Sequence, residues 1–128
     1  NDDPSHAFMH GPTFMGNALA CAAALKSIEL FETQDYLAKI QRIEAITRQE
    51  MRDLHDPRIQ DVRFMGGCVC VETKEASTLR GYQQFAYDRG VFSRPFLRCL
   101  YAMVPYVIDD DSLVQVLDTM KVWFQRTL

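Results

Sequence analysis

The chain has 128 residues, is 48% hydrophobic and carries a formal net charge of −3, a composition that predicts one folded domain with a modest core. Acidic and basic residues are mixed along it, which argues against nucleic acid or an anionic membrane as a partner. No apolar run approaches the roughly 20 residues of a membrane span, and residues 1–5 lack both the basic and the apolar region of a signal peptide.

Residues 8–24 are the most informative segment of the chain. A Gly11-Pro12-Thr13 turn precedes Gly16 and Asn17, and an alanine-rich helix follows. A rigid loop of this kind, ahead of a helix N-terminus, offers a threonine hydroxyl and backbone N–H groups to an anion, usually a phosphate. By itself, the Pro-Thr pair is also compatible with an ordinary turn before a helix. His10 is interpreted as a loop residue.

Hydrophobic periodicity and capping residues predict four helices. The first has Asn17 as its N-cap and runs to about residue 32, and the second begins at 33–35 and ends near Leu54. A third is expected over 77–89, with Gly90 as its stop. The last opens at the acidic run 109–112 and should bury one stripe of side chains: Leu113, Leu117, Met120 and Phe124.

The strands are expected between these helices. Residues 59–65 and 68–72 are joined by Gly66-Gly67, a pair typical of a hairpin turn, so an antiparallel pairing is predicted. Two shorter strands are expected at 91–93 and 99–104. Together the elements predict an α+β domain, with helices packed on one face of a three- or four-stranded, mainly antiparallel sheet.

Four cysteines and three histidines bear on metal binding and on the redox compartment. Cys21, Cys68, Cys70 and Cys99 lie in apolar surroundings, and the histidines do not complete the spacing of a zinc site. We therefore predict no metal site, buried free thiols and a cytoplasmic protein.

Arg94 and Tyr101 are the remaining candidate site residues. Arg94 lies among apolar and aromatic residues in the segment 91–96, where a guanidinium is costly unless it meets an anion such as a carboxylate. The alternative is an internal salt bridge to Glu72 or to an aspartate. Tyr101 lies in an apolar strand and is equally compatible with a core position and with a pocket.

The string Met9-His10-Gly11-Pro12-Thr13-Phe14-Met15-Gly16-Asn17 and the later Arg94-Pro95-Phe96 resemble the class III aminotransferases, which depend on pyridoxal 5'-phosphate. The resemblance implies the small C-terminal domain of a fold-type I transferase, with residues 1–16 as a cofactor-loop segment and 17–128 as the domain. It implies that Pro12 and Thr13 contact the cofactor phosphate. Gly11, Arg94 and Tyr101 would then contact the substrate.

Within the family, the same strings resemble most closely the members that transfer an amino group from S-adenosylmethionine to 8-amino-7-oxononanoate in biotin biosynthesis. This implies an enzyme that works as a homodimer, with Arg94 on the substrate carboxylate. The four lysines all fall on expected helix surfaces or in a connection, so the chain lacks the Schiff-base lysine and should be inactive alone. The alternatives are another class III ω-aminotransferase and a non-catalytic α+β module for dimerisation or metabolite binding.

Overall fold

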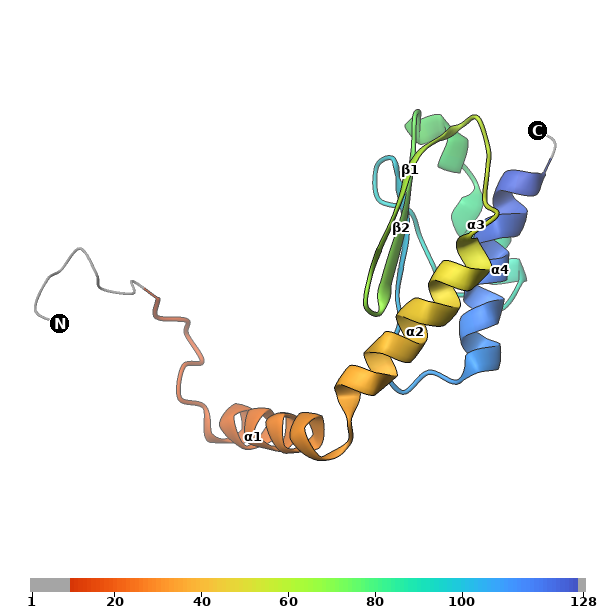
Figure 1. Ribbon diagram of the computed structural model, residues 1–128. Coiled ribbons are helices and arrows are strands. Elements are labelled where there is room, and N and C mark those ends of the chain that lie inside the picture. The colour runs from red at the N-terminus through yellow and green to blue at the C-terminus, as the bar shows by residue number, and fades with distance from the viewer. Residues whose placement is uncertain (1–9, 127–128) are drawn as a thin grey trace, which may run out of the picture. The chain divides into compact units, whose positions relative to one another are not determined.

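The computed structural model describes residues 10–126, and the chain divides into two compact units, Asn1–Asp35 and Tyr36–Leu128 (Figure 1). The first unit contains helix α1 (Ala18–Thr33), which begins directly after Asn17, as the sequence predicts. None of the residues of α1 is buried. Residues 1–9 of the expected cofactor-loop segment lie outside the described residues.

The second unit contains a three-stranded antiparallel sheet in the order β1 (Ile59–Met65), β2 (Cys68–Thr73) and β3 (Cys99–Met103). Met65 pairs with Cys68 across the turn, which confirms the hairpin at the two glycines. On its other side β2 pairs with β3, with Cys70 opposite Tyr101. Strand β3 is therefore an edge of this sheet.

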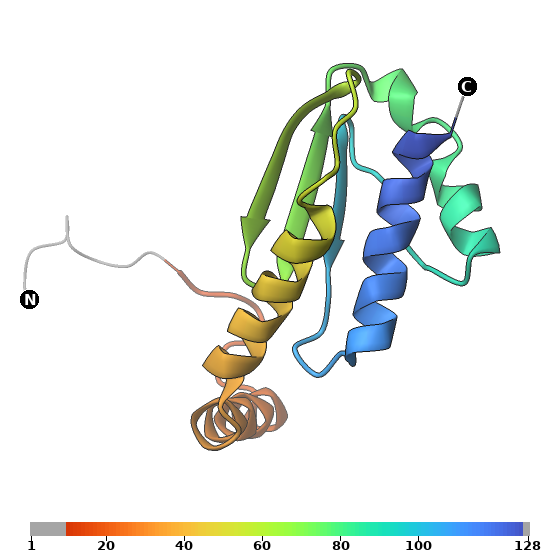
Figure 2. The same ribbon diagram turned by 45° about the vertical axis from the view of Figure 1, so that its right-hand side comes forward.

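Two long helices cover one face of the sheet, α2 (Tyr36–Met51) and α4 (Asp110–Gln125) (Figure 2). Alternate side chains of β2 and β3 point to these helices and are buried, while their neighbours remain partly exposed. The predicted stripe of α4 is confirmed, and its residues join a core that includes Ile43, Val71 and Leu100. The α+β architecture expected from the sequence is thus present.

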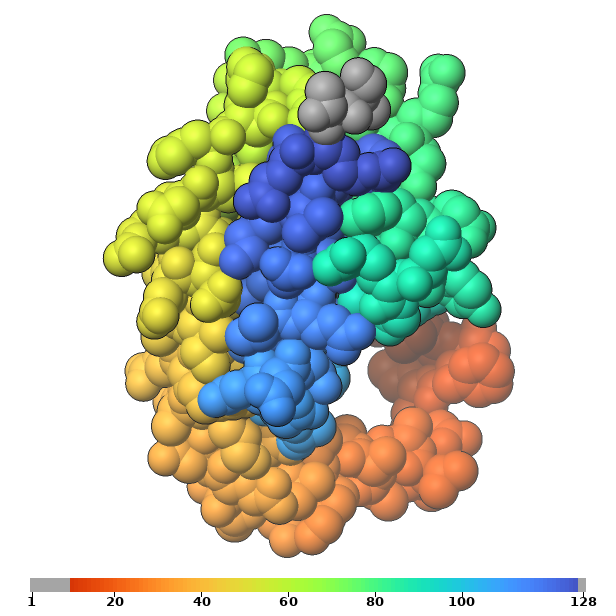
Figure 3. Space-filling model, turned by 90° about the vertical axis from the view of Figure 1, so that its right-hand side faces the viewer, coloured from red at the N-terminus to blue at the C-terminus, as the bar shows by residue number. Residues whose placement is uncertain are grey.

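The N-terminus of α4 carries the cap that the sequence predicts. Asp109 precedes the helix, and its carboxylate accepts a hydrogen bond of 2.8 Å from the backbone N–H of Ser112. Hydrogen bonds from Ser112 lower the pKa of Asp109. Figure 3 shows α4 running between α2 on one side and α3 (Tyr82–Asp88) on the other. Within residues 10–126, no helix is long and apolar enough to cross a membrane.

The single helix expected over 77–89 is wrong. The segment forms a 3-10 helix, η2 (Ala76–Leu79), and then the short helix α3. Between them Arg80 is extended and Gly81 has a φ of +85°, a left-handed conformation that glycine adopts without steric cost. Gly81 thus divides the helix that the hydrophobic pattern alone predicts as continuous.

The strand expected at Val91–Ser93 is also absent. Residues 91–95 pair with no strand, although Phe96 forms an isolated bridge to Cys99. Pro95 contributes to this because it has no N–H to donate to a neighbouring strand. This unpaired segment carries Arg94, one of the candidate site residues.

Candidate functional site

The loop before α1 is a turn fixed by its own backbone. The backbone N–H of Met15 donates a hydrogen bond of 3.0 Å to the carbonyl oxygen of Pro12, so that Thr13 lies inside the turn. Asn17 then caps the helix, because its side-chain oxygen accepts a hydrogen bond of 2.9 Å from the backbone N–H of Ala20. The sequence pattern predicts this local order, in which a rigid turn leads directly into a helix N-terminus.

The side chain of Thr13 is exposed, and its hydroxyl forms no hydrogen bond with any of residues 10–126. Gly11 is open as well, since a Cβ built there would meet only the end of the Met15 side chain, at 3.9 Å. The turn therefore presents a free hydroxyl and an unobstructed backbone, which is what contact with a phosphate or a small substrate requires.

In the second unit, Arg94 and Tyr101 line the same pocket, which has a volume of about 350 Å³. The pocket lies at β3, the edge strand, and is bordered by the unpaired segment 91–94 and by residues 101–105. Its walls are mostly apolar, and α4 and the segment before it close the inner side with Ile108 and Val116. The sequence does not predict these last two, because only the tertiary packing brings them to β3.

Arg94 is exposed and forms no ion pair with the described residues. The alternative of a salt bridge to Glu72 is wrong, because two other arginines occupy that carboxylate. Arg63 lies 2.8 Å from one oxygen of Glu72 and Arg98 lies 3.0 Å from the other. Among the described residues, no carboxylate pairs with the guanidinium of Arg94, which lies beside a mostly apolar pocket.

Tyr101 lies on the sheet face opposite to the helices and is half-buried. Its neighbours in the strand, Leu100 and Ala102, are the residues that point into the core. Tyr101 is therefore not a core residue of this unit, and it is one of the residues that line the pocket with Arg94.

None of the four lysines is among the residues that line this pocket. Lys26 and Lys121 each form an ion pair with a glutamate, at 2.6 and 2.8 Å, and the ammonium of Lys39 lies 4.5 Å from the centre of a tyrosine ring. Lys74 is exposed between β2 and η2. None of them lines any of the pockets formed by the described residues.

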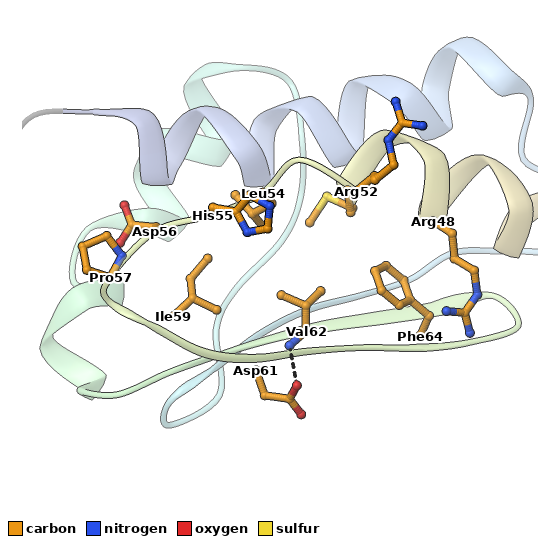
Figure 4. Close-up of a pocket in the computed structure, with 11 residues that line it drawn as sticks. Arg48, Arg52, Leu54, His55, Asp56, Pro57, Ile59, Asp61, Val62 and Phe64 are labelled. Carbon is orange, nitrogen blue, oxygen red and sulfur yellow. Dashed lines mark hydrogen bonds between the residues drawn. The ribbon is translucent and has the colours of Figure 1, made fainter.

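A larger pocket, of about 670 Å³, has β1 as one wall (Figure 4). Its other wall is formed by the end of α2 and the loop that follows this helix. Val62 and Phe64 point into the gap from the strand, whereas Asp61 points away on the other side. The guanidinium of Arg48 lies 4.9 Å from the centre of the Phe64 ring and pairs with Glu44 at 2.7 Å. None of the predicted site residues lines this pocket. The guanidinium of Arg48 is already paired with Glu44, so it is not left to bind a ligand's anion.

The prediction of buried thiols is wrong in part. All four cysteines are free, but Cys21 is exposed on α1, and Cys68, Cys70 and Cys99 are only half-buried. On the open sheet face, burial and the neighbouring Cys99 raise the pKa of Cys70 to about 11. At neutral pH this thiol is therefore protonated and a weak nucleophile.

Comparison with known proteins gives the family. Residues 1–124 match the family model described as aminotransferase class III. The chain belongs to the class III aminotransferase family. Its curated relatives in this family include the adenosylmethionine-8-amino-7-oxononanoate aminotransferase of Corynebacterium glutamicum, 40% identical over 111 residues, which cover 86% of this chain and 26% of that protein. The enzyme of that name from Saccharomyces cerevisiae is 33% identical, with 91% of this chain and 26% of that protein covered.

Solved structures of aminotransferases share the fold. The adenosylmethionine-8-amino-7-oxononanoate aminotransferase of Methanocaldococcus jannaschii superposes with a TM-score of 0.78 at 24% identity, over 91% of this chain and 30% of that one. The ornithine aminotransferase of Toxoplasma gondii, which holds pyridoxal phosphate at partial occupancy in its active site, gives 0.77 at 26% identity, over 91% and 28%. The chain thus spans between a quarter and a third of the length of these class III aminotransferases.

Proposed function

We propose that the chain is the C-terminal part of an aminotransferase that moves an amino group from S-adenosylmethionine to 8-amino-7-oxononanoate, giving 7,8-diaminononanoate in biotin biosynthesis. The names of the relatives at 40% and 33% identity support this substrate pair. The observation that carries the proposal is that Arg94 and Tyr101 line one mostly apolar pocket, where no carboxylate of residues 10–126 pairs with the arginine.

In this proposal Arg94 holds the carboxylate of the keto acid, at the end of the molecule far from the reacting carbonyl. A guanidinium binds a carboxylate through two parallel hydrogen bonds and so fixes its orientation. The apolar walls, among them Val91, Met103 and Val104, would bury the alkyl chain, and the ring of Tyr101 would border it. The distance from Arg94 would then select keto acids of the right chain length.

The turn before α1 suits the phosphate of pyridoxal 5'-phosphate. Thr13 has a hydroxyl with no partner among the described residues, and Pro12 fixes the turn that exposes it. Gly11 leaves room for substrate against the backbone. When bound, the cofactor supplies the carbonyl and the electron sink of transamination. No lysine of this chain has the buried setting that the cofactor needs, so we infer that the chain is inactive without the rest of the enzyme.

The remaining assignments follow from the same proposal. We infer a homodimer, in which the phosphate contact of Thr13 is made to a cofactor held mainly by the other subunit, as the family resemblance implies. A cytoplasmic location is supported by the four free thiols.

Steady-state kinetics of the full-length enzyme test the proposal. Arg94→Ala should raise the KM for 8-amino-7-oxononanoate about ten- to a hundredfold, the size of a lost charge-assisted hydrogen bond, and leave the KM for S-adenosylmethionine unchanged. Arg98→Ala is the matched control, because its guanidinium pairs with Glu72. Thr13→Val should weaken binding of the cofactor in a fluorescence titration.

Two results would overturn the proposal. An enzyme that prefers ornithine or 4-aminobutyrate to the keto acid would be another ω-aminotransferase of the family. Equal KM values for the wild type and Arg94→Ala would remove the carboxylate contact.

A further inference from the structure

Two buried hydroxyl groups lie next to the segment that carries Arg94. Among residues 10–126, the buried side-chain polar atoms that have no hydrogen-bond partner are the side-chain oxygens of Tyr82 and Ser93. They belong to different elements, α3 and the unpaired segment 91–95, and Ser93 directly precedes Arg94. A buried hydroxyl without a partner is costly, so the occurrence of two at one place calls for a physical reason.

Ser93 lies against α3, since it lines one pocket together with Gln83 and Gln84 of that helix. Burial raises the pKa of the Tyr82 phenol, and the hydroxyl of Ser93 lowers it again in part. Both groups can donate and accept, and their hydrogens rotate freely, so a small movement completes a hydrogen bond between them. Each is then the partner that the other lacks.

The Tyr82 side chain is a fixed point in the fold. It is fully buried, and its ring packs edge-on against Trp123 of α4 with 5.5 Å between ring centres. A second ring, Phe85 on the same helix, lies 6.3 Å away. A hydroxyl held on such a ring has a well-defined position.

The segment that carries Arg94 has few other attachments. The N–H of Val91 donates a hydrogen bond of 2.9 Å to the carbonyl oxygen of Ala86, and Phe96 exchanges two hydrogen bonds of 2.9 Å with Cys99. Between these points, residues 92–95 form no backbone hydrogen bond with any described residue. The hydroxyl of Ser93 is therefore the buried polar group of this segment that lies nearest to Arg94 along the chain.

We propose that Tyr82 and Ser93 are positioning residues, whose paired hydroxyls tie the segment 91–95 to α3 and so hold Arg94 at the mouth of the pocket. This inference rests on the proposed function, in which Arg94 binds the substrate carboxylate. It adds a specificity device to that function, because the position of Arg94 sets the length of keto acid that fits.

Kinetics of the full-length enzyme test the pairing. Tyr82→Phe and Ser93→Ala should each raise the KM for 8-amino-7-oxononanoate about three- to tenfold, with kcat and the KM for S-adenosylmethionine unchanged. The double variant should have the same KM for the keto acid as either single variant, because both changes break the same hydrogen bond. Tyr87→Phe, which removes an exposed hydroxyl from the same helix, is the matched control.

A second substrate separates the two proposals. With the methyl ester of the keto acid, which lacks the charge that Arg94 would bind, the Tyr82 and Ser93 variants should match the wild type. If Arg94→Ala raises the KM for the acid but Tyr82→Phe and Ser93→Ala do not, the positioning role is wrong and the proposed function stands. If Arg94→Ala has no effect, the proposed function itself fails. Variants that lower the melting temperature without changing any KM would show a purely structural pair.

Discussion

The hairpin between β1 and β2 has two adjacent glycines, and the structure predicts that replacing them has very different consequences. Gly66 has a φ of +54°, and a Cβ built on it would lie 2.8 Å from Cγ2 of Ile40 on α2. Its N–H also donates a hydrogen bond of 2.6 Å to the carboxylate of Glu44, which fixes the turn against the helix. Gly67 has no positive φ, and its Cβ would lie 3.1 Å from the ring of Tyr106.

Gly66→Ala should therefore be strongly destabilising. The left-handed conformation costs alanine about 1 to 2 kcal/mol, and the forced displacement of a β-branched side chain adds a cost of similar size, so the sum is about 2 to 4 kcal/mol. The free energy of unfolding of Gly67→Ala should lie within about 1 kcal/mol of the wild-type value. Alanine reduces the conformational freedom of the unfolded chain, which stabilises the fold, and the ring of Tyr106 can move to accommodate the new methyl group.

Urea unfolding of the chain measures both changes, with fluorescence of its single tryptophan as the signal. Trp123 lies in the core of the second unit, so its emission reports the unfolding of that unit. With an ordinary urea slope, Gly66→Ala should lower the midpoint by about 1 to 2 M. Ile40→Ala removes the side chain that the new Cβ would displace. In that background, Gly66→Ala should therefore lower the free energy of unfolding only by the cost of the left-handed backbone. Equal midpoints for Gly66→Ala and Gly67→Ala, or an unchanged cost in that background, would refute the reasoning.

Two further predictions concern charge and thiol chemistry. Hydrogen bonds from Arg58 lower the pKa of Asp56 below its ordinary 3.8, so this ion pair should stabilise the fold above that pH and be lost as the pH falls through the lowered pKa. Asp56→Asn should thus lower the urea midpoint at about pH 6 more than at about pH 2, and an equal loss at both pH values would contradict this. With a disulfide reagent at about pH 8, Cys21 should react fast because it is exposed, and Cys70 slowly because its pKa is raised to about 11. Mass mapping of the first labelled site checks the order, and first labelling of Cys70 would refute it.

Local sequence signals determined most of the secondary structure. Asn17 and Asp109 have side chains that accept hydrogen bonds from the first turn of a helix, and both cap one here. The glycine pair 66–67 permits a tight turn, and the apolar stripe of the last helix has a single face to bury. Such features act within a few residues of one another, so they could be predicted without the fold. The motif at 9–17 likewise indicates the family by itself.

Tertiary structure decided the features that depend on contacts between distant residues. The sequence offered Glu72 as a partner for Arg94, but sheet register places Arg63 and Arg98 beside that carboxylate and leaves Arg94 at the pocket. The left-handed conformation of Gly81 divided a helix that periodicity alone made continuous. Which charges meet and which hydroxyls face each other depends on register and packing, since these bring together residues that are remote along the chain.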